Sequence, residues 1–205
     1  MINLHLGDCL SAMAKMKDKE YELAIVDPPY RDKNEPDQWL RANSGNMKEW
    51  LPAPKQDYFK EIERVSSNFI IWGGNYFTQW LLPNNNWIVW HKLNAGVHFS
   101  MCELAYCTVR KNVQLYKLLP DKDKIHPTQK PVKLYEWLLK NYAKQGDRIL
   151  DTHLGSGSSA IAAYNMGYDF TGYELDKDYF DAAVKRLEDH KRQGSLFTPQ
   201  DIFSR

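Results

Sequence analysis

The sequence contains few cysteines and no long apolar stretch. Its 205 residues include three cysteines, Cys9, Cys102 and Cys107, and none of them forms a CxxC pair, so neither a disulfide framework nor a zinc site is indicated. No window approaches the roughly eighteen uninterrupted apolar residues of a membrane span, and the N-terminus lacks the pattern of a signal peptide. We therefore expect reduced cysteines, no membrane partner and a cytoplasmic location.

An excess of charge of one sign is also missing. The formal net charge is +1, so the total charge gives no argument for or against a nucleic-acid partner. One basic cluster contains Arg110, Lys111, Lys117, Lys122, Lys124 and Lys130 beside Asp121 and Asp123. This cluster is either a solvated loop or a contact surface for a polyanion. The histidines, including His126, show no metal-ligand spacing, and no metal is expected.

Short runs of β-branched and aromatic residues alternate with longer amphipathic stretches. Strands are expected at residues 3–6, 23–26, 68–72, 87–91, 103–109, 148–151 and 169–173. Several of these runs are apolar without alternation, as in parallel strands that are covered on both faces. The pattern predicts an α/β fold with a doubly wound, Rossmann-like sheet in a single domain.

Four amphipathic segments between the strands predict helices. The first is expected to begin at Asp57 as its N-cap, and the others cover residues 134–142, 159–165 with a stop near Gly167, and 180–187. Residues 31–54 and 110–125 are expected to form long loops. We place the domain at residues 1–192 and a C-terminal tail at residues 193–205.

A glycine-rich turn stands out in "ILDTHLGSGSSAIAA", residues 149–163. A strand ends on Asp151, a turn with Gly155 and Gly157 follows, and a helix begins at once. Glycines let backbone amides approach a ligand, and the helix start adds partial positive charge. About twenty residues after Gly155, Glu174 ends the next strand, where such folds place a carboxylate on ribose hydroxyls. GxGxxG itself is absent, and the alternative is a plain tight turn.

The tetrapeptide "DPPY", Asp27 to Tyr30, ends another apolar strand. An exocyclic amine on a base is a poor nucleophile, and two acceptors for its hydrogens favour the pyramidal nitrogen that attacks a methyl group. The Asp27 carboxylate and the Pro28 carbonyl can be these acceptors, and the prolines hold them still. Tyr30 can stack on a base that has left its helix. The alternative is a strand that ends in a Pro-Pro turn with a surface tyrosine.

Taken together, these stretches resemble the amino-group DNA methyltransferases that use S-adenosylmethionine, in the circularly permuted arrangement called the beta group. "LHLGDCL", "DPPY", "HPTQKP", "ILDTHLGSGS" and "GYELDKDYFDAAVKRL" agree with that family in order, over nearly the whole chain. The resemblance implies a catalytic tetrapeptide of Asp27, Pro28, Pro29 and Tyr30. It implies that the cofactor is held by Asp8, Cys9, Lys130, Pro131, Asp151, Gly155, Ser156, Gly157, Ser158 and Glu174.

Two departures from the family pattern limit this comparison. Family members usually have Pro-Phe where this chain has Thr152 and His153, so the cofactor pocket is expected to differ in shape. There is also no room for a separate target-recognition domain between the strand at residues 103–109 and "HPTQKP". Contacts with double-stranded DNA are therefore expected from the two long loops, which would flank the Asp27 pocket. The candidates are Arg31, Lys33, Trp39, Arg41, Lys48, Trp50, Arg110, Lys111, Lys122 and Lys124.

The resulting hypothesis is a DNA methyltransferase that acts on the N6 amine of a flipped adenine by direct displacement. Cytosine N4 poses the same chemical problem and stays an alternative, and RNA is a further substrate class. From a different class, the chain could be an inactive DNA-binding subunit, although Asp27 and Tyr30 are both present. The sequence leaves open whether the chain acts alone or as a homodimer.

Overall fold

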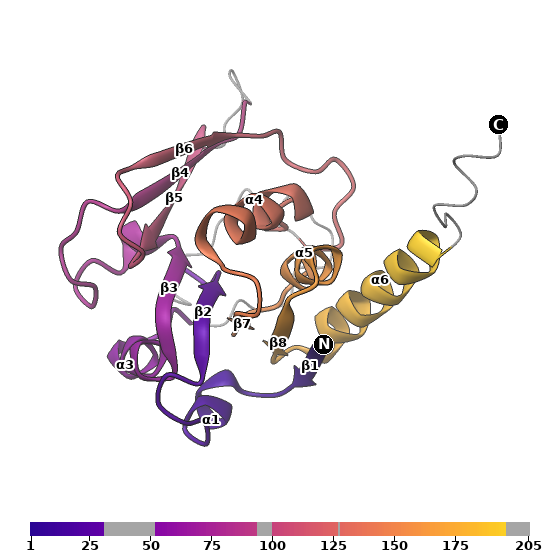
Figure 1. Cartoon of the computed structure of the whole chain (residues 1–205), viewed down its shortest axis with the longest axis horizontal. Helices are drawn as coiled ribbons and strands as arrows, with labels where there is room; N and C mark the ends of the chain where they lie inside the picture. The colour runs from indigo at the N-terminus through magenta and orange to yellow at the C-terminus, as the bar shows by residue number, and fades with distance from the viewer. Residues whose placement is uncertain (31–51, 94–99, 127, 196–205) are drawn as a thin grey trace.

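A central sheet of eight strands organises the chain in the computed structural model, which describes residues 1–30, 52–93, 100–126 and 128–195 (Figure 1). The strands are β1 (Ile2–Leu6), β2 (Tyr21–Val26), β3 (Ser66–Trp72), β4 (Trp87–His91), β5 (Cys102–Cys107), β6 (Gln114–Lys117), β7 (Arg148–Asp151) and β8 (Asp169–Glu174). Their order across the sheet is β1-β8-β7-β2-β3-β5-β4-β6. Within the described part of the chain, β5 alone runs antiparallel to its neighbours, β3 and β4.

Helices cover both faces of this sheet, as Figure 1 shows. Helices α1 (Cys9–Met13) and α3 (Gln56–Val65) lie on one face, and α4 (Val132–Tyr142) and α5 (Ser158–Met166) lie on the other. Helix α6 (Lys177–Ser195) packs beside α5, and a short 3-10 helix, η1 (Gly74–Tyr76), follows β3. The prediction of a doubly wound α/β sheet is confirmed. None of the helices in the described ranges has both the length and the apolar character to cross a membrane.

The apolar strands are buried on both sides. In β2, Leu23 and Ile25 join the core beneath α4 and α5, whereas Ala24 and Val26 join the core beneath α1 and α3. Successive side chains of a strand point to opposite faces, so a strand covered twice needs an uninterrupted apolar run. This geometry explains why the central strands show no alternation of apolar and polar residues.

Helix ends agree with the sequence in one case and differ in two. Helix α5 ends at Gly167, whose φ of +73° lets its amide bond back to the last turn, as predicted. Asp57 was expected to be an N-cap, but α3 begins earlier, after Lys55, so Asp57 lies in the first turn and complements the helix dipole there. Helix α6 continues to Ser195, three residues into the predicted tail.

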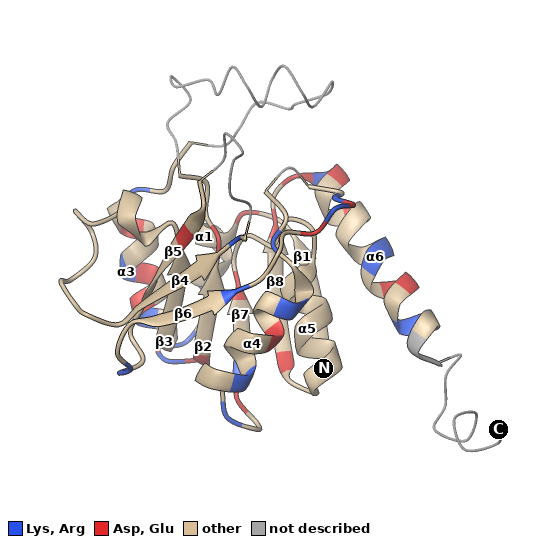
Figure 2. Cartoon of the chain, turned by 90° about the horizontal axis from the view of Figure 1, so that it is seen from above, with Lys and Arg blue, Asp and Glu red and all other residues tan. Residues whose placement is uncertain are grey.

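Among the described residues, three elements were not predicted: α1, η1 and β6. Strand β6 interrupts the expected loop at residues 110–125 and pairs in parallel with β4. Its four residues alternate between partly buried and exposed, and such a short run carries little signal in a sequence. The longer α6 has pairs of opposite charge three or four residues apart, such as Lys185 with Asp189, and Figure 2 shows charges of both signs along it.

Candidate active site

Four acidic side chains meet at one edge of the sheet because their strands are parallel. Asp8 follows β1, Asp27 follows β2, Asp151 ends β7 and Glu174 ends β8. Strands β7 and β2 are neighbours, but the helix after β2 lies on one face of the sheet and the helix after β7 lies on the other (Figure 1). Ligands bind at such a switch point in doubly wound sheets. The predicted catalytic acid, Asp27, and the glycine turn therefore lie on either side of the position where a ligand is expected.

The glycine turn after β7 is shaped by two left-handed residues, Gly155 with φ +51° and Gly157 with φ +74°. A Cβ atom on Gly157 would lie 3.1 Å from the Cβ of Ala183 in α6, so the turn packs closely against that helix. Asp151 anchors the start of the turn, because its carboxylate accepts the His153 amide at 3.0 Å and the Ser159 hydroxyl at 2.5 Å. Burial raises the pKa of Asp151 to about 7.

Glu174 ties β8 to this turn. One carboxylate oxygen accepts the backbone amide of Gly155 at 2.8 Å and the other accepts that of Asp176 at 2.9 Å. Burial raises the pKa of Glu174 although these amides oppose the rise. The side chain is partly exposed, and each carboxylate oxygen has a second lone pair. Glu174 can hold the turn and accept a ligand hydroxyl at the same time.

The side chains of Ser156 and Ser158, two residues that were predicted to hold the cofactor, pack against α6. The side chains of Ser156 and Ser158 are buried and lie 3.1 Å apart, and Arg186 of α6 donates to the Ser158 hydroxyl and to the Ser156 carbonyl. These side chains therefore brace the turn against α6. Any contact of Ser156 or Ser158 with a cofactor would come from the backbone.

Asp8 and Cys9 stand at the start of α1. The Asp8 carboxylate caps the helix through the Ser11 amide at 2.8 Å and the Ser11 hydroxyl at 2.6 Å, and these bonds lower its pKa. Burial raises the pKa of the Cys9 thiol to about 12. The thiol therefore stays protonated near neutral pH and is not a nucleophile.

Thr152 and His153, the departure from the family pattern, form a hydrogen-bonded unit with Tyr58 of α3. The Tyr58 hydroxyl lies 2.6 Å from the Thr152 hydroxyl, which lies 2.9 Å from Nδ1 of His153. The rings of His153 and Tyr58 pack edge to face at 5.3 Å. Burial lowers the pKa of His153 to about 4, so the ring is neutral at physiological pH. An uncharged ring thus occupies the position next to the turn.

Asp27 is held by a cation and a hydroxyl. Nζ of Lys130 lies 2.5 Å from one Asp27 carboxylate oxygen, and the Tyr30 hydroxyl donates to the other. Burial raises the pKa of Asp27, and the Lys130 charge opposes this rise. Lys130 also lies 3.2 Å from the Tyr30 hydroxyl and 3.0 Å from a Glu103 carboxylate oxygen. Lys130 was predicted to contact the cofactor, but its charged end lies within this group. Pro131 is the buried N-cap residue of α4 beside it.

The Tyr30 ring is not free to stack on both sides. It stacks on Tyr76 of η1 with centroids 5.1 Å apart and an interplanar angle of 14°. A Cβ atom on Gly73, where φ is +66°, would come within 2.2 Å of the Tyr30 ring, so only glycine fits there. Gly73 and Tyr76 were not recognised from the sequence, although "GGNY" directly after a buried strand was an available signal.

Two other residues near Asp27 were also missed, Glu103 and Lys92. Glu103 lies at the start of β5 and Lys92 directly after β4, and Lys92 Nζ is 2.5 Å from a Glu103 oxygen. Glu103 is a single acid in one strand and Lys92 follows another strand, so no sequence motif marks either residue. Across the described residues, no group of three or more histidine, cysteine or acidic side chains could hold a metal ion.

The predicted DNA-contacting residues separate into three groups. Arg31, Lys33, Trp39, Arg41, Lys48 and Trp50 lie outside the described residues. Arg110 and Lys111 follow the antiparallel strand β5, so they lie at the edge opposite Asp27, and Lys111 donates to the Asn141 carbonyl at the far end of α4. The prediction that they flank the pocket is therefore wrong. Lys122 and Lys124 are exposed and follow β6, which returns to the Asp27 edge.

Comparisons with known proteins agree on one family. The model of the family described as DNA methylase matches residues 89–185. The putative methylase YubD of Escherichia coli strain K12 is 25% identical over 199 residues, which cover 88% of this chain and 88% of that protein. The type II methyltransferase M2.DpnII of Streptococcus pneumoniae is 29% identical over 159 residues, covering 73% of this chain and 59% of that protein. The crystal structure of the M1.HpyAVI–SAM complex matches with a TM-score of 0.63 at 23% identity, over 91% of this chain and all of that one, and shares the fold.

Proposed function

Because this chain belongs to the DNA methylase family of N6 and N4 amino-methyltransferases, we propose that it methylates the exocyclic N6 amine of an adenine turned out of double-stranded DNA. The observation that carries this proposal is the position of Asp27. Its carboxylate stands at the end of β2, directly beside the glycine turn after β7, with a tyrosine and a buried lysine fixing its two oxygens.

The residues around the turn fit S-adenosylmethionine as the methyl donor. Gly155 has no side chain to fill the space beside its amide, and the Glu174 carboxylate has acceptor capacity for ribose hydroxyls. The neutral His153 ring adds no charge that would repel a sulfonium cation. When bound, this cofactor supplies an electrophilic methyl group. We propose that Asp8, Cys9, Asp151, Glu174 and residues 155–158 hold it.

Asp27 and Pro28 orient the amine. An ionised carboxylate and a carbonyl accept the two amine hydrogens and favour the nitrogen geometry that develops in the transition state. Pro28 and Pro29 fix the backbone at these acceptors, and Tyr30 and Tyr76 present aromatic rings beside them. After transfer the nitrogen carries an extra proton, for which Asp27 is the neighbouring acceptor. No cysteine attack is needed, and burial raises the pKa of both Cys9 and Cys107.

The proposal extends to organisation and location. Residues 1–192 act as the catalytic domain, and the short connection between residues 109 and 126 favours a short target site. We place the reaction in the cytoplasm, and light scattering of the purified chain would distinguish a monomer from a homodimer.

The test uses labelled S-adenosylmethionine, DNA and nucleoside digestion of the product. Wild-type chain should yield N6-methyladenine. Asp27→Asn should lower the rate by about 100-fold or more, because an amide oxygen cannot replace an ionised acceptor. Asp57→Asn, which changes an exposed aspartate in α3, is the matched control and should keep the wild-type rate.

Three other results would each contradict the proposal. Recovery of N4-methylcytosine alone would replace adenine by cytosine as the target. Methylation of RNA in preference to DNA would replace the substrate class. A chain that binds the cofactor and DNA without any transfer would be an inactive subunit.

A further inference from the structure

A row of alternating charges runs through the site, from Lys92 to Glu103 to Lys130 to Asp27. The successive contacts measure 2.5 Å, 3.0 Å and 2.5 Å. The Lys130 side chain is 2% exposed, and those of Asp27, Lys92 and Glu103 are 14%, 15% and 24% exposed. Buried charges are stable only when they are paired, so each group in this row depends on its neighbours.

We propose that Glu103 is a positioning residue for methyl transfer, which acts through Lys130 to hold the Asp27 carboxylate ready for the amine. The inference rests on the proposed function, because it assigns a role in the same reaction. Glu103 does not touch Asp27, so its effect on the amine acceptor is indirect.

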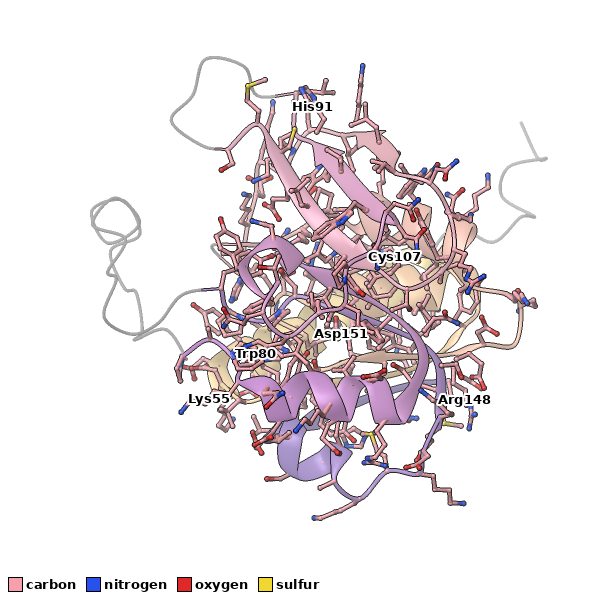
Figure 3. The ribbon with its side chains drawn as sticks, turned by 90° about the vertical axis from the view of Figure 1, so that its left-hand side faces the viewer. Lys55, Trp80, His91, Cys107, Arg148 and Asp151 are labelled. Carbon is pink, nitrogen blue, oxygen red and sulfur yellow. The ribbon has the colours of Figure 1, made fainter. Side chains whose placement is uncertain are left out.

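The topology explains how a residue from the start of a strand reaches this edge. Strand β5 runs against β3, with Ala105 opposite Trp72, so Glu103 lies beyond the end of β3 at the Asp27 edge. Strand β4 pairs with β5 so that His91 faces Cys102, which brings Lys92 to the same place. Figure 3 labels His91 and Cys107, which mark opposite ends of this strand pair. Because β5 runs antiparallel to its neighbours, its first residues lie at the Asp27 edge, and the Glu103 carboxylate is among them.

Lys130 must change partners during the reaction. In this structure its ammonium group donates to the Asp27 oxygen, where it competes with the target amine. When the amine takes that position, Lys130 loses one anionic partner but keeps Glu103. Without Glu103, a buried ammonium group would be left without a carboxylate, and that cost would oppose entry of the amine.

The charges around Asp27 and Glu103 set the direction of the expected titration shifts. Asp27 faces Lys130, Glu103, Tyr30, Asp151, Tyr58 and Tyr135, and Glu103 faces Lys92, Lys130, Lys124, Tyr30 and Tyr135. Although burial opposes it, the lysine charges lower the pKa of Glu103 to about 2, so it stays ionised at neutral pH. Its negative charge raises the pKa of Asp27, and the Lys130 charge lowers it.

Two variants should therefore move Asp27 in opposite directions. Glu103→Gln removes a negative charge and leaves Lys130 to Asp27 alone, so the Asp27 titration midpoint should fall by about one pH unit. Lys92→Met leaves Lys130 as the partner of Glu103. Glu103 then draws the Lys130 ammonium group away from Asp27, so the Asp27 midpoint should rise. Glu103→Asp keeps the charge and should restore most of the wild-type behaviour. Lys92→Met changes a residue at a strand end and keeps the test available if Glu103→Gln does not fold.

The readout combines one measurement that needs no reaction with one that does. The ¹³C resonance of the Asp27 carboxyl, assigned with Asp27→Asn, gives its midpoint in the purified full chain. Steady-state methylation gives kcat, KM and the acid limb of the pH profile. Glu103→Gln should lower kcat by about tenfold or more with KM for S-adenosylmethionine unchanged, and its acid limb should move with the midpoint.

The control is Glu22→Gln, which removes an acid that pairs with Arg148 at the opposite edge of the sheet. It should leave the Asp27 midpoint and kcat unchanged. An Asp27 midpoint that stays at the wild-type value in both Glu103→Gln and Lys92→Met would overturn the positioning role. A wild-type chain that methylates no DNA, but whose midpoint responds as described, would refute the proposed function and with it the role in methyl transfer, and would leave only the electrostatic coupling of Glu103 to Asp27 through Lys130.

Discussion

Asp151 is a carboxyl whose titration is dominated by its burial at the end of β7. It ends β7 at 1% exposure, and Figure 3 shows it at the other end of the strand from Arg148. Its two oxygens accept a backbone amide and a hydroxyl, but no cation lies against it among the described residues. Burial therefore dominates and raises its pKa to about 7.

The consequence for stability follows from proton linkage. The folded carboxyl titrates near pH 7 and the unfolded one near its ordinary value of 3.8, so the folded chain binds an extra proton between about pH 4 and 7. The free energy of unfolding loses this contribution as the pH rises through that window. Asn at this position cannot titrate, yet it can still accept the His153 amide and donate to Ser159.

The free energy of unfolding of Asp151→Asn should therefore increase relative to that of the wild type as the pH rises. Between pH 5 and 7.5 the difference in unfolding free energy should move in favour of the variant by about 2.5 kcal/mol. Urea unfolding of both chains at the two pH values measures it. A difference that is the same at both pH values would show that this carboxyl does not titrate in that range.

At this scale, the sequence was informative where residue type and strand end coincide. Asp27, Asp151 and Glu174 each follow an apolar run, so their shared edge could be predicted from parallel topology alone. Glu103, Lys92 and Tyr58 could not be predicted. Their importance comes from contacts with Lys130 and Thr152 across long stretches of chain, and no local pattern encodes such contacts.

The connection from β3 to η1 shows how a short element limits an aromatic ring. Gly73 and Gly167 both have left-handed φ values, +66° and +73°. A side chain at Gly167 would meet nothing within 4 Å, whereas one at Gly73 would overlap the Tyr30 ring. The two glycines therefore share one backbone requirement and differ in steric surroundings.

Gly73→Ala and Gly167→Ala form a matched pair. Both should lose about 1 kcal/mol of unfolding free energy through the backbone term. Only Gly73→Ala should also reduce methylation, by about tenfold or more, because Tyr30 must leave its place beside Asp27. Thermal unfolding and methyl incorporation measure the two effects. Equal methylation by both variants would mean that the Tyr30 position is not needed.

Elements with buried apolar residues were predictable, and short elements at the surface were not. β7 and β4 have the predicted bounds, and α4 and α5 lie where helical spacing places them. Strand β6 and helix α1 are as short as β7 and β4, but of their residues only Met13 is buried, whereas three of the four residues of β7 are buried. The reversal of β5 was equally hidden, because strand direction depends on the connection and not on the strand's own residues.

At the scale of the whole molecule, the four described basic residues among the predicted DNA contacts divide between two edges of the sheet. Lys122 and Lys124 lie on the Asp27 edge, and Arg110 and Lys111 lie on the other. Lys124 is near enough to Lys92, Glu103 and Lys130 to interact electrostatically with all three. Of these four residues, we expect only the first pair to contact DNA.

Charge reversal at the two edges should separate their roles. Lys122→Glu combined with Lys124→Glu should raise KM for DNA by about tenfold, with a smaller effect at high salt, because phosphate contacts are electrostatic. Arg110→Glu, at the opposite edge, should leave KM unchanged. Steady-state kinetics at two salt concentrations provide the comparison. A larger effect from Arg110→Glu would place the DNA on the other side of the sheet.

The row of four charges joins distant parts of the chain, and Asp27 and Lys130 are 103 positions apart. When Asp27 and Tyr30 emerge from the ribosome, Lys130, the glycine turn and β8 have not yet been synthesised. A nascent chain thus carries the acid long before it carries the means to use it. Catalytic competence should consequently arrive late in translation, and a product truncated before Lys130 should be unable to methylate DNA.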